Sequence, residues 1–378
     1  MAGALPFTLG IEEEYFLVDR QSRDLKIDPP PAMMERAQSL LRDQVAPEFL
    51  KCQIEVGTTV CTSLAEARAQ LALLRRTIAA VAAEFGLAPI AASTHPFAQW
   101  ESTQPTDKAR YAAIAQDLQV VGRRLVICGM HVHVGIPDDE LRIDLMNQVR
   151  YFLPHLLMLA TSSPFWRGAD TGLKSYRLSI FRELPRTGLP EAFESFGEYK
   201  RHVDVLVKAG LVEDATKLWW DIRPSARFPT VEMRIADVCT RLEDALAVAA
   251  IYRCILSMLH RLRRANQRWR VYARMLIEEN RWRAQRYGFE RGLVDFGKGK
   301  VEPALGLVEE ILALVREDAE AFGCVAEVEH ARAILARGTS ADRQRGVLLE
   351  ALAAGADRTE ALRAVVDWLI AETVAGTA

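Results

Sequence analysis

Three short segments of the sequence each carry two chemically active side chains separated by a single residue. The pairs are Glu12 with Glu14, His131 with His133, and Glu232 with Arg234. Each pair lies in a strand-like apolar segment, and side chains two residues apart on a strand share one face. The three strands would together present carboxylates, imidazoles and a guanidinium.

Glu12 and Glu14 suit a divalent cation. On one face of a strand their positions are about 6.6 Å apart, and a cation beside them would relieve the repulsion between the carboxylates. Mg²⁺ and Mn²⁺ prefer hard oxygen ligands of this type. Taken alone, the segment also fits an exposed strand with ordinary surface glutamates. Glu13 points to the opposite face and is excluded from the metal set.

The other two pairs also have structural alternatives. Histidines at i and i+2 can ligate a metal or donate to phosphate oxygens, but one of them can equally be a buried core residue. Glu232 beside Arg234 can be a plain ion pair, or a metal ligand next to a guanidinium that binds phosphate. The combination of all three pairs favours a metal–triphosphate site, because phosphoryl transfer depends on positioning and charge neutralisation.

No glycine-rich phosphate loop accompanies these pairs. The sequence contains neither G-x-x-x-x-G-K-[ST] nor G-x-G-x-x-G. The Gly-Lys-Gly-Lys segment at 297–300 is interpreted as an exposed turn. If the protein binds ATP, we expect it to do so on a sheet surface through metal ions.

The elements that must position the pairs form an α+β pattern. Strands are expected over 7–19, 51–60, 87–93, 125–136, 218–223 and 229–237, and helices over 63–85, 107–123 and 138–160. A Pro-, Gly- and Arg-rich stretch at 162–190 is expected to be a long functional loop. Beyond residue 241 the pattern is almost wholly helical. The uneven spacing favours an antiparallel or mixed sheet with helices packed on one face.

Composition indicates an ordinary globular protein of 378 residues, with 50% hydrophobic and 26% charged residues and a net charge of −2. This balance gives no reason to expect nucleic acid or an anionic membrane as a partner. No apolar run approaches the roughly 18 residues of a spanning helix. The start, residues 1–7, lacks the features of a secretion signal, and the six scattered cysteines suit a reducing compartment. A cytoplasmic location is expected, and a homodimer is the default oligomer.

The motifs around the three pairs resemble the glutamine synthetase-like superfamily, and within it the carboxylate–amine ligases, also called type 2 glutamate–cysteine ligases. The resemblance extends over most of the chain, and its carriers are Phe7–Glu14, Glu55–Thr58, Thr94–Phe97, His131–Gly135, Trp220–Ser225 and Thr230–Arg234. It implies a saddle-shaped, largely antiparallel sheet with metals on its concave face. The whole chain, 1–378, would be a single catalytic domain, with a strand-bearing core at 1–240 and a helical part at 241–378.

The resemblance also implies roles for single residues. The metal ligands would be Glu12, Glu14, Glu55, His131 and Glu232, with Glu48 as a further candidate. Glu48 lies seven residues before Glu55, so an uninterrupted strand would place the two on opposite faces, and a turn between them is required. His133 and Arg234 would contact the ATP phosphates.

The implied reaction joins a carboxylate to an amine through an acyl phosphate, with ATP and Mg²⁺ or Mn²⁺ as cofactors. The substrates would be small molecules, nominally glutamate and cysteine. Candidates for binding the substrate carboxylate are Arg177, Arg182, Arg223 and Arg227, and Trp220 or its neighbour Trp219 could flank adenine. Two alternatives stay open. One is a guanidino kinase-like phosphotransferase, which makes no amide, and the other is a non-catalytic nucleotide- or metal-binding regulator.

Overall fold

The computed structural model describes residues 5–378, apart from the side chains of Arg110 and Ala113. Most of the N-terminal stretch considered as a secretion signal therefore lies outside the described residues.

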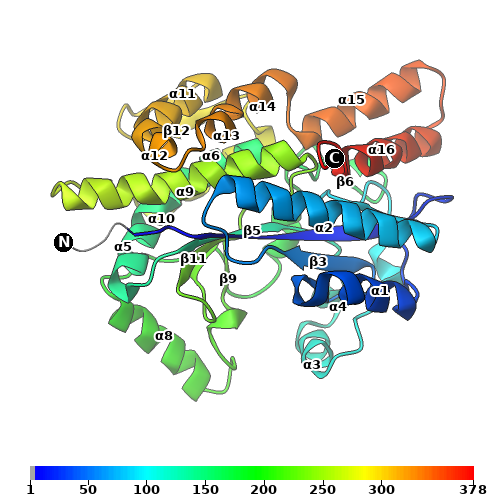
Figure 1. Cartoon of the computed structure of the whole chain (residues 1–378), viewed down its shortest axis with the longest axis horizontal. Helices are drawn as coiled ribbons and strands as arrows, with labels where there is room; N and C mark the ends of the chain where they lie inside the picture. The colour runs from blue at the N-terminus through cyan, green and yellow to red at the C-terminus, as the bar shows by residue number, and fades with distance from the viewer. Residues whose placement is uncertain (1–4) are drawn as a thin grey trace.

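An antiparallel sheet forms the centre of the fold (Figure 1). In order across the sheet the strands are β10 (Ile222–Pro224), β11 (Thr230–Met233), β5 (Met130–Gly135), β1 (Leu9–Asp19), β3 (Gln53–Gly57) and β2 (Val45–Pro47), and β4 (Leu87–Ile90) pairs with the end of β1. The long strand β1 is central because it pairs with three other strands, β3, β4 and β5. The largely antiparallel sheet expected from the sequence is confirmed.

Two long helices, α2 (Leu64–Glu84) and α9 (Leu242–Arg264), cover one face of the sheet (Figure 1). Helix α2 begins where the Ser63 side chain accepts a hydrogen bond from the Glu66 backbone N–H, which satisfies a free donor of the first turn. It ends before Gly86, whose φ of 73° suits glycine. Glu13 points from β1 toward α2, where it pairs with Arg75, and Glu12 and Glu14 face the other way.

The opposite side of the sheet is bordered by shorter elements. Helices α3 (Ala109–Leu118) and α4 (Val120–Arg123) lie near one end, and α8 (Phe196–Lys208) lies near the other (Figure 1). Strands β8 (Thr187–Gly188) and β9 (Trp219–Trp220) form a small parallel pair on the α8 side. These segments flank the face that carries the predicted site.

The remaining elements pack around this centre. The helices are α1 (Pro31–Leu41), α5 (Asp139–Val149), α6 (Leu153–Ala160), α7 (Arg177–Phe181), α10 (Arg274–Tyr287), α11 (Ala304–Leu314), α12 (Arg316–Ala321), α13 (Val325–Glu329), α14 (Ala331–Arg337), α15 (Ser340–Ala353) and α16 (Arg358–Thr373). Two hairpins, β6 (Phe165–Trp166) with β7 (Ala169–Asp170) and β12 (Leu293–Asp295) with β13 (Lys300–Glu302), accompany them. One continuous hydrophobic core connects the sheet to the C-terminal helices. The Gly-Lys-Gly-Lys segment lies at the β12–β13 turn, as expected.

Hydrophobic patterning predicted most elements but not their breaks. The helix expected over 107–123 is interrupted at Gln119, whose φ of 50° ends α3. The helix expected over 138–160 is two helices joined by a 3₁₀ turn, Arg150–Phe152, just before Pro154, which cannot donate a backbone hydrogen bond. The strand expected over 125–136 starts only at Met130. The predicted loop at 162–190 contains the short helix α7.

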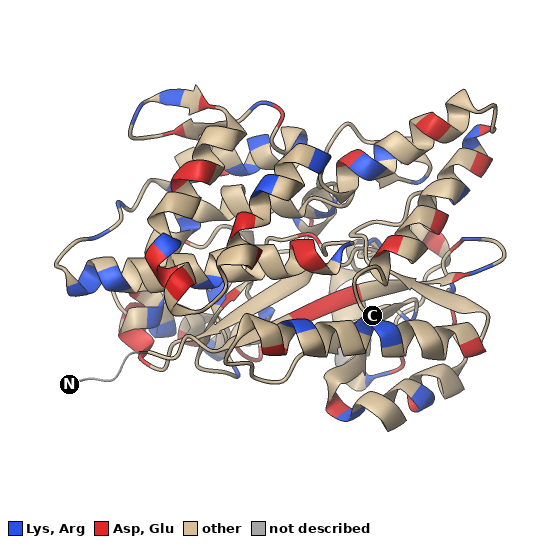
Figure 2. Cartoon of the chain, turned by 45° about the horizontal axis from the view of Figure 1, so that its top comes forward, with Lys and Arg blue, Asp and Glu red and all other residues tan. Residues whose placement is uncertain are grey.

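Charges of both signs intermingle on the helices in the view of Figure 2. Among the helices of the described residues, none combines the length and the apolar character needed to cross a membrane.

Candidate metal and nucleotide site

The register of the sheet brings the three predicted pairs together. Glu12 on β1 lies opposite His131 on β5, and His133 lies opposite Glu232 on β11. Side chains directly opposite each other on antiparallel strands share a face, with Cβ atoms about 5 Å apart. Alternation along each strand therefore places all of these groups on one surface.

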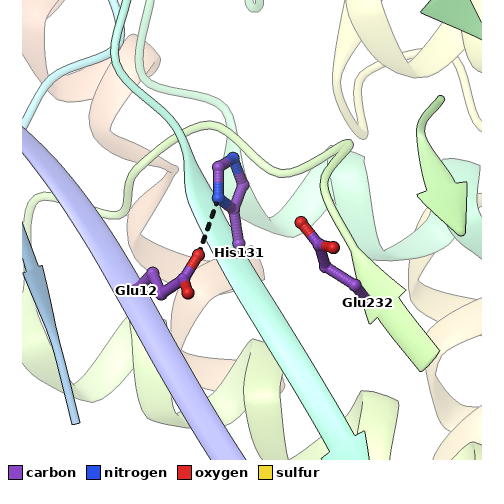
Figure 3. A group of neighbouring side chains, drawn as sticks. All are labelled: Glu12, His131 and Glu232. Atoms are coloured by element: carbon purple, nitrogen blue, oxygen red, sulfur yellow. Dashed lines mark hydrogen bonds and ion pairs between the residues drawn. The ribbon is translucent and has the colours of Figure 1, made fainter. Parts of the chain in front are cut away.

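Glu12, His131 and Glu232 form the first cluster (Figure 3). One potential ligand atom from each lies within 4.8 Å of the other two. His131 Nδ1 is 3.1 Å from Glu12 Oε2, and the three side chains project from three neighbouring strands (Figure 3). Two carboxylates and an imidazole are suitable ligands for a divalent cation.

Glu14, Glu48 and Glu55 form a second cluster that meets the same distance limit of 4.8 Å. Glu14 lies directly opposite Glu55. Glu48 follows the last residue of β2, and the chain then turns back into β3. The turn required between Glu48 and Glu55 is therefore present.

Burial and mutual repulsion dominate the second cluster. Burial, followed by the nearby Glu48 carboxylate, raises the pKa of Glu14 to about 8. Burial and the surrounding carboxylates also raise the pKa of Glu55 well above its usual range. Carboxylates this close cannot all ionise without a compensating positive charge. The donor set fits a divalent cation such as Mg²⁺ or Mn²⁺, which would favour the ionised forms.

The first cluster has the opposite electrostatic balance. Burial disfavours the charged form of Glu12, but hydrogen bonds with His131 and His133 outweigh it and hold the pKa of Glu12 well below its usual range. Burial, assisted by Arg234, lowers the pKa of His131 to about 4. His131 is therefore neutral near pH 7, which is the form that can ligate a metal.

Two guanidinium groups hold Glu232. Arg223 donates to both carboxylate oxygens at 2.8 and 3.1 Å, and Arg234 also pairs with this side chain. Burial opposes ionisation of Glu232, but the two arginines outweigh it and keep its pKa below the usual range. The buried Nε of Arg234 has no hydrogen-bond partner among the described residues. A buried donor without a partner is costly, so this atom indicates a place for an anionic ligand.

Arg177 is buried beneath the site. Its guanidinium donates to the backbone carbonyls of Ile235 and Arg234 at 3.3 and 3.2 Å and lies 5.4 Å from the centre of the Phe181 ring. The space beside it is small, because a Cβ on Gly129 would lie 2.4 Å from Arg177 Nη2 and the guanidinium would have to shift. Arg177 thus connects the strand end that carries Arg234 to the neighbouring wall of the site.

A cavity of about 450 Å³ collects the predicted residues, with two exceptions. Trp220, predicted to bind the cofactor, is not part of the lining; its ring centre lies 5.9 Å from that of Phe193 and 6.3 Å from that of Tyr199. Its neighbour Trp219 lines the cavity. Arg182, a candidate for the substrate carboxylate, is exposed and pairs with Glu278.

Two buried residues that support Arg234 were not predicted. Arg281 donates to both oxygens of Asp221 at 2.6 and 3.2 Å, and the Asp221 backbone carbonyl accepts from the N–H groups of Arg234 and Ile235. Asp221 lies inside the apolar strand segment at 218–223, and an acidic residue in such a segment indicates a buried ion pair. Nothing local in the helical region marks Arg281 as its partner.

Solved structures share this fold. The chain is similar to a bifunctional glutathione synthetase from Pasteurella multocida, with a TM-score of 0.70 and 16% identity. The matched region comprises 97% of this chain and 52% of the synthetase chain. It is also similar to a glutamate–cysteine ligase from Francisella tularensis in complex with AMP, with a TM-score of 0.67 and 14% identity. The matched region comprises 97% of this chain and 89% of the ligase chain. The chain spans about half the length of the synthetase. Together with the sequence family that the chain matches over most of its length, this fold is that of an ATP-dependent carboxylate–amine ligase.

The sequence profile of glutamate–cysteine ligase family 2 matches residues 8–367, and the chain belongs to this family. A Rhodospirillum rubrum protein, whose assignment as glutamate–cysteine ligase 2 is provisional, is 67% identical over 373 residues, or 98% of this chain and 96% of that one. A Jannaschia protein with the same provisional assignment is 56% identical, over 96% of each chain. The resemblance inferred from the motifs is confirmed.

Proposed function

We propose that the cavity binds ATP together with divalent cations, Mg²⁺ or Mn²⁺, and uses them to activate a substrate carboxylate for amide formation. The observation that carries this proposal is the convergence, on one cavity, of two clusters of cation ligands and the unpartnered Nε of Arg234. Glu12, His131 and Glu232 would hold one cation. Glu14, Glu48 and Glu55 would hold another.

The proposed chemistry has two steps. An oxygen of the substrate carboxylate attacks the γ-phosphorus of ATP, and the bond from that phosphorus to the β–γ bridging oxygen breaks. ADP is the leaving group, and the substrate becomes an acyl phosphate. The amine nitrogen then attacks the acyl carbon and the bond from that carbon to the phosphate oxygen breaks. The proton lost by the nitrogen passes to the departing phosphate, so amide and inorganic phosphate are released. A bound divalent cation supplies neutralisation of phosphate charge.

The residues of the chain act mainly by binding and positioning. Arg234 would donate its free Nε to a phosphate oxygen, and Arg223 fixes Glu232 on the same side of the cavity. His133, whose Nδ1 lies 2.9 Å from Thr230 Oγ1, is held with its other nitrogen toward Glu12. Positive groups fixed in place before the reaction cost no reorganisation as charge moves. Arg177 would bind or orient the substrate carboxylate beside Glu14.

Glutamate and cysteine are the nominal substrates, supported by the names of the related proteins. A cytoplasmic homodimer is the proposed form of the enzyme, by the sequence arguments given above.

Turnover assays with product analysis test the proposal. Purified protein, ATP and Mg²⁺ or Mn²⁺ are combined with glutamate and a panel of amines, and ADP and amide are quantified by mass spectrometry. We expect amide and ADP in equal amounts, dependent on metal, carboxylate and amine together. ADP with a phosphorylated guanidine and no amide would instead support the kinase-like alternative. Nucleotide binding without any turnover would support the regulator.

A further inference from the structure

We propose that the amine substrate is an α-amino acid with an aliphatic or aromatic side chain, which occupies an apolar wall at the α3 end of the cavity. This inference rests on the proposed ligase function and replaces cysteine, the nominal amine substrate, with an amino acid that has a larger apolar side chain.

The cavity has two ends, which lie beside opposite edges of the sheet. At the β10–β11 end, its lining includes Arg223, Arg227 and His133, together with Trp219. Arg227 is exposed and has no carboxylate within ion-pair distance among the described residues. The exposed guanidinium of Arg227 and the imidazole of His133 suit the polyphosphate of ATP, so the nucleotide belongs at this end.

The opposite end, beside β2 and β3, has an apolar wall. Tyr111, Ile114 and Leu118 line the cavity, and their spacing places them on one side of α3. Phe49 lies below them, with its ring centre 5.8 Å from that of Tyr111. Phe49 also closes against α4, because a Cβ on Gly122 would lie 3.5 Å from the Phe49 ring.

The wall continues across the cavity. Phe181 and Leu184, from the end of α7 and the turn after it, also line it. Arg124 at the end of α4 pairs with Glu183 of this turn at 2.8 Å. This ion pair joins the two halves of the wall. Ile114 and Phe181 are only half-buried, so they present apolar surface that a bound side chain would cover.

The wall adjoins the place where the amine must react. The second acidic cluster contains Glu48, the residue before Phe49. On the other side, Arg177 lies over Phe181. A carboxylate activated between Arg177 and this cluster would therefore meet its amine beside the wall. Burying a charged side chain there without a partner would be costly.

Lys108 is the proposed partner of the α-carboxylate of the amino acid. It lies at the start of α3, lines the cavity, and has no carboxylate within ion-pair distance among the described residues. Its Nζ lies 5.5 Å from the centre of the Tyr111 ring. An amino acid could thus pair its α-carboxylate with Lys108 and direct its side chain along Tyr111, Ile114 and Leu118.

Competing amines of nearly equal size test the assignment. Leucine and asparagine are compared as amine substrates with glutamate, ATP and Mg²⁺, and kcat/KM is measured for amide formation. We expect leucine to exceed asparagine by about tenfold or more, the range in which apolar pockets discriminate. Equal values, or a preference for asparagine, would overturn the inference and leave the ligase function intact. Absence of amide with every amine would overturn both.

Substitutions locate the wall. Ile114→Asn and Leu184→Asn should each reduce kcat/KM for leucine about tenfold while KM for ATP stays unchanged. Val120→Asn is the matched control, since Val120 is exposed on α4 and is not part of the cavity lining; it should behave as the parent protein. A rise in KM for ATP in the wall variants, with leucine unaffected, would place the nucleotide base on the wall and contradict the inference.

Discussion

Glu13 and Arg75 form a fully buried ion pair directly behind the two predicted metal ligands of β1. Arg75 donates to the two Glu13 oxygens at 2.9 and 2.6 Å, and neither side chain is exposed to solvent. The same guanidinium donates to the backbone carbonyls of Cys239 and Thr240. Glu13 lies between Glu12 and Glu14, so this pair fixes the strand whose other face carries them.

Removing one partner of this pair should destabilise the protein strongly. Arg75→Ala leaves the Glu13 carboxylate buried without its cation, and we expect the free energy of unfolding to fall by about 3–5 kcal/mol. Urea denaturation measures this change. Arg68→Ala is the control, because Arg68 makes only a partly exposed pair with Glu243, which should contribute less than about 1 kcal/mol. Similar losses in both variants would contradict the structural role.

Glu12→Gln and Glu14→Gln should each abolish metal-dependent turnover without loss of folding. Each substitution removes one anionic ligand from a different cluster but preserves the size of the side chain. Turnover at several Mg²⁺ and Mn²⁺ concentrations, together with circular dichroism, separates the two effects. Glu35→Gln, on the exposed side of α1, is the control. Normal turnover of both site variants would remove these residues from the proposed metal set.

Strand alternation alone predicted which side chains share the functional face. It placed Glu12 and Glu14 on one side of β1 and Glu13 on the other, because period-two alternation is a local property of the chain. The pairing of Glu12 with His131 depends on the register between strands more than 100 residues apart. Local pattern does not give this register, and the motif resemblance implied only that both residues ligate metals.

The differences between the structure and the sequence-based expectations have local physical causes. Strand β9 contains only Trp219 and Trp220, too few residues for alternation to define which one faces the cavity. The break at Gln119 interrupts a helical pattern that is otherwise continuous. The Asp221–Arg281 pair connects residues 60 positions apart, and no local signal marks the arginine.

Trp219→Ala and Trp220→Ala should have different effects. Trp219 lines the cavity near Arg223, so its loss should raise KM for ATP while the unfolding free energy changes little. Trp220 packs on Phe193 and Tyr199, so its loss should destabilise the protein by about 1–2 kcal/mol and leave KM for ATP nearly unchanged. Steady-state kinetics and urea denaturation on both variants check this. The reverse assignment would restore Trp220 as the nucleotide contact.

Gly129→Ala should impair turnover through Arg177. The new Cβ would lie 2.4 Å from Arg177 Nη2 and 2.9 Å from its guanidinium carbon, so the side chain must move. A displacement of this size next to a reacting group costs on the order of 100-fold in rate. Gly306→Ala in α11 is the matched control, because nothing lies within 4 Å of its Cβ position. Equal kcat values for the two variants would show that Arg177 has no positioning role.

His155 should make the protein less stable in mild acid. Burial lowers its pKa to about 4, whereas an exposed histidine titrates near pH 6.5. Between these values the unfolded chain binds a proton that the folded chain excludes. Stability is therefore lost as the pH falls from 6.5 to 4, by up to about 3 kcal/mol for this group.

His155→Phe removes the titrating group while keeping an aromatic ring against Tyr151 and Phe152. Urea denaturation at intervals from pH 4 to 7 should give a shallower loss of stability for this variant than for the parent protein. Part of the slope should remain, because burial also lowers the pKa of His95 to about 4. His202→Phe, at an exposed position on α8, should leave the slope unchanged. A parent-like slope in His155→Phe would mean that other buried groups control acid stability.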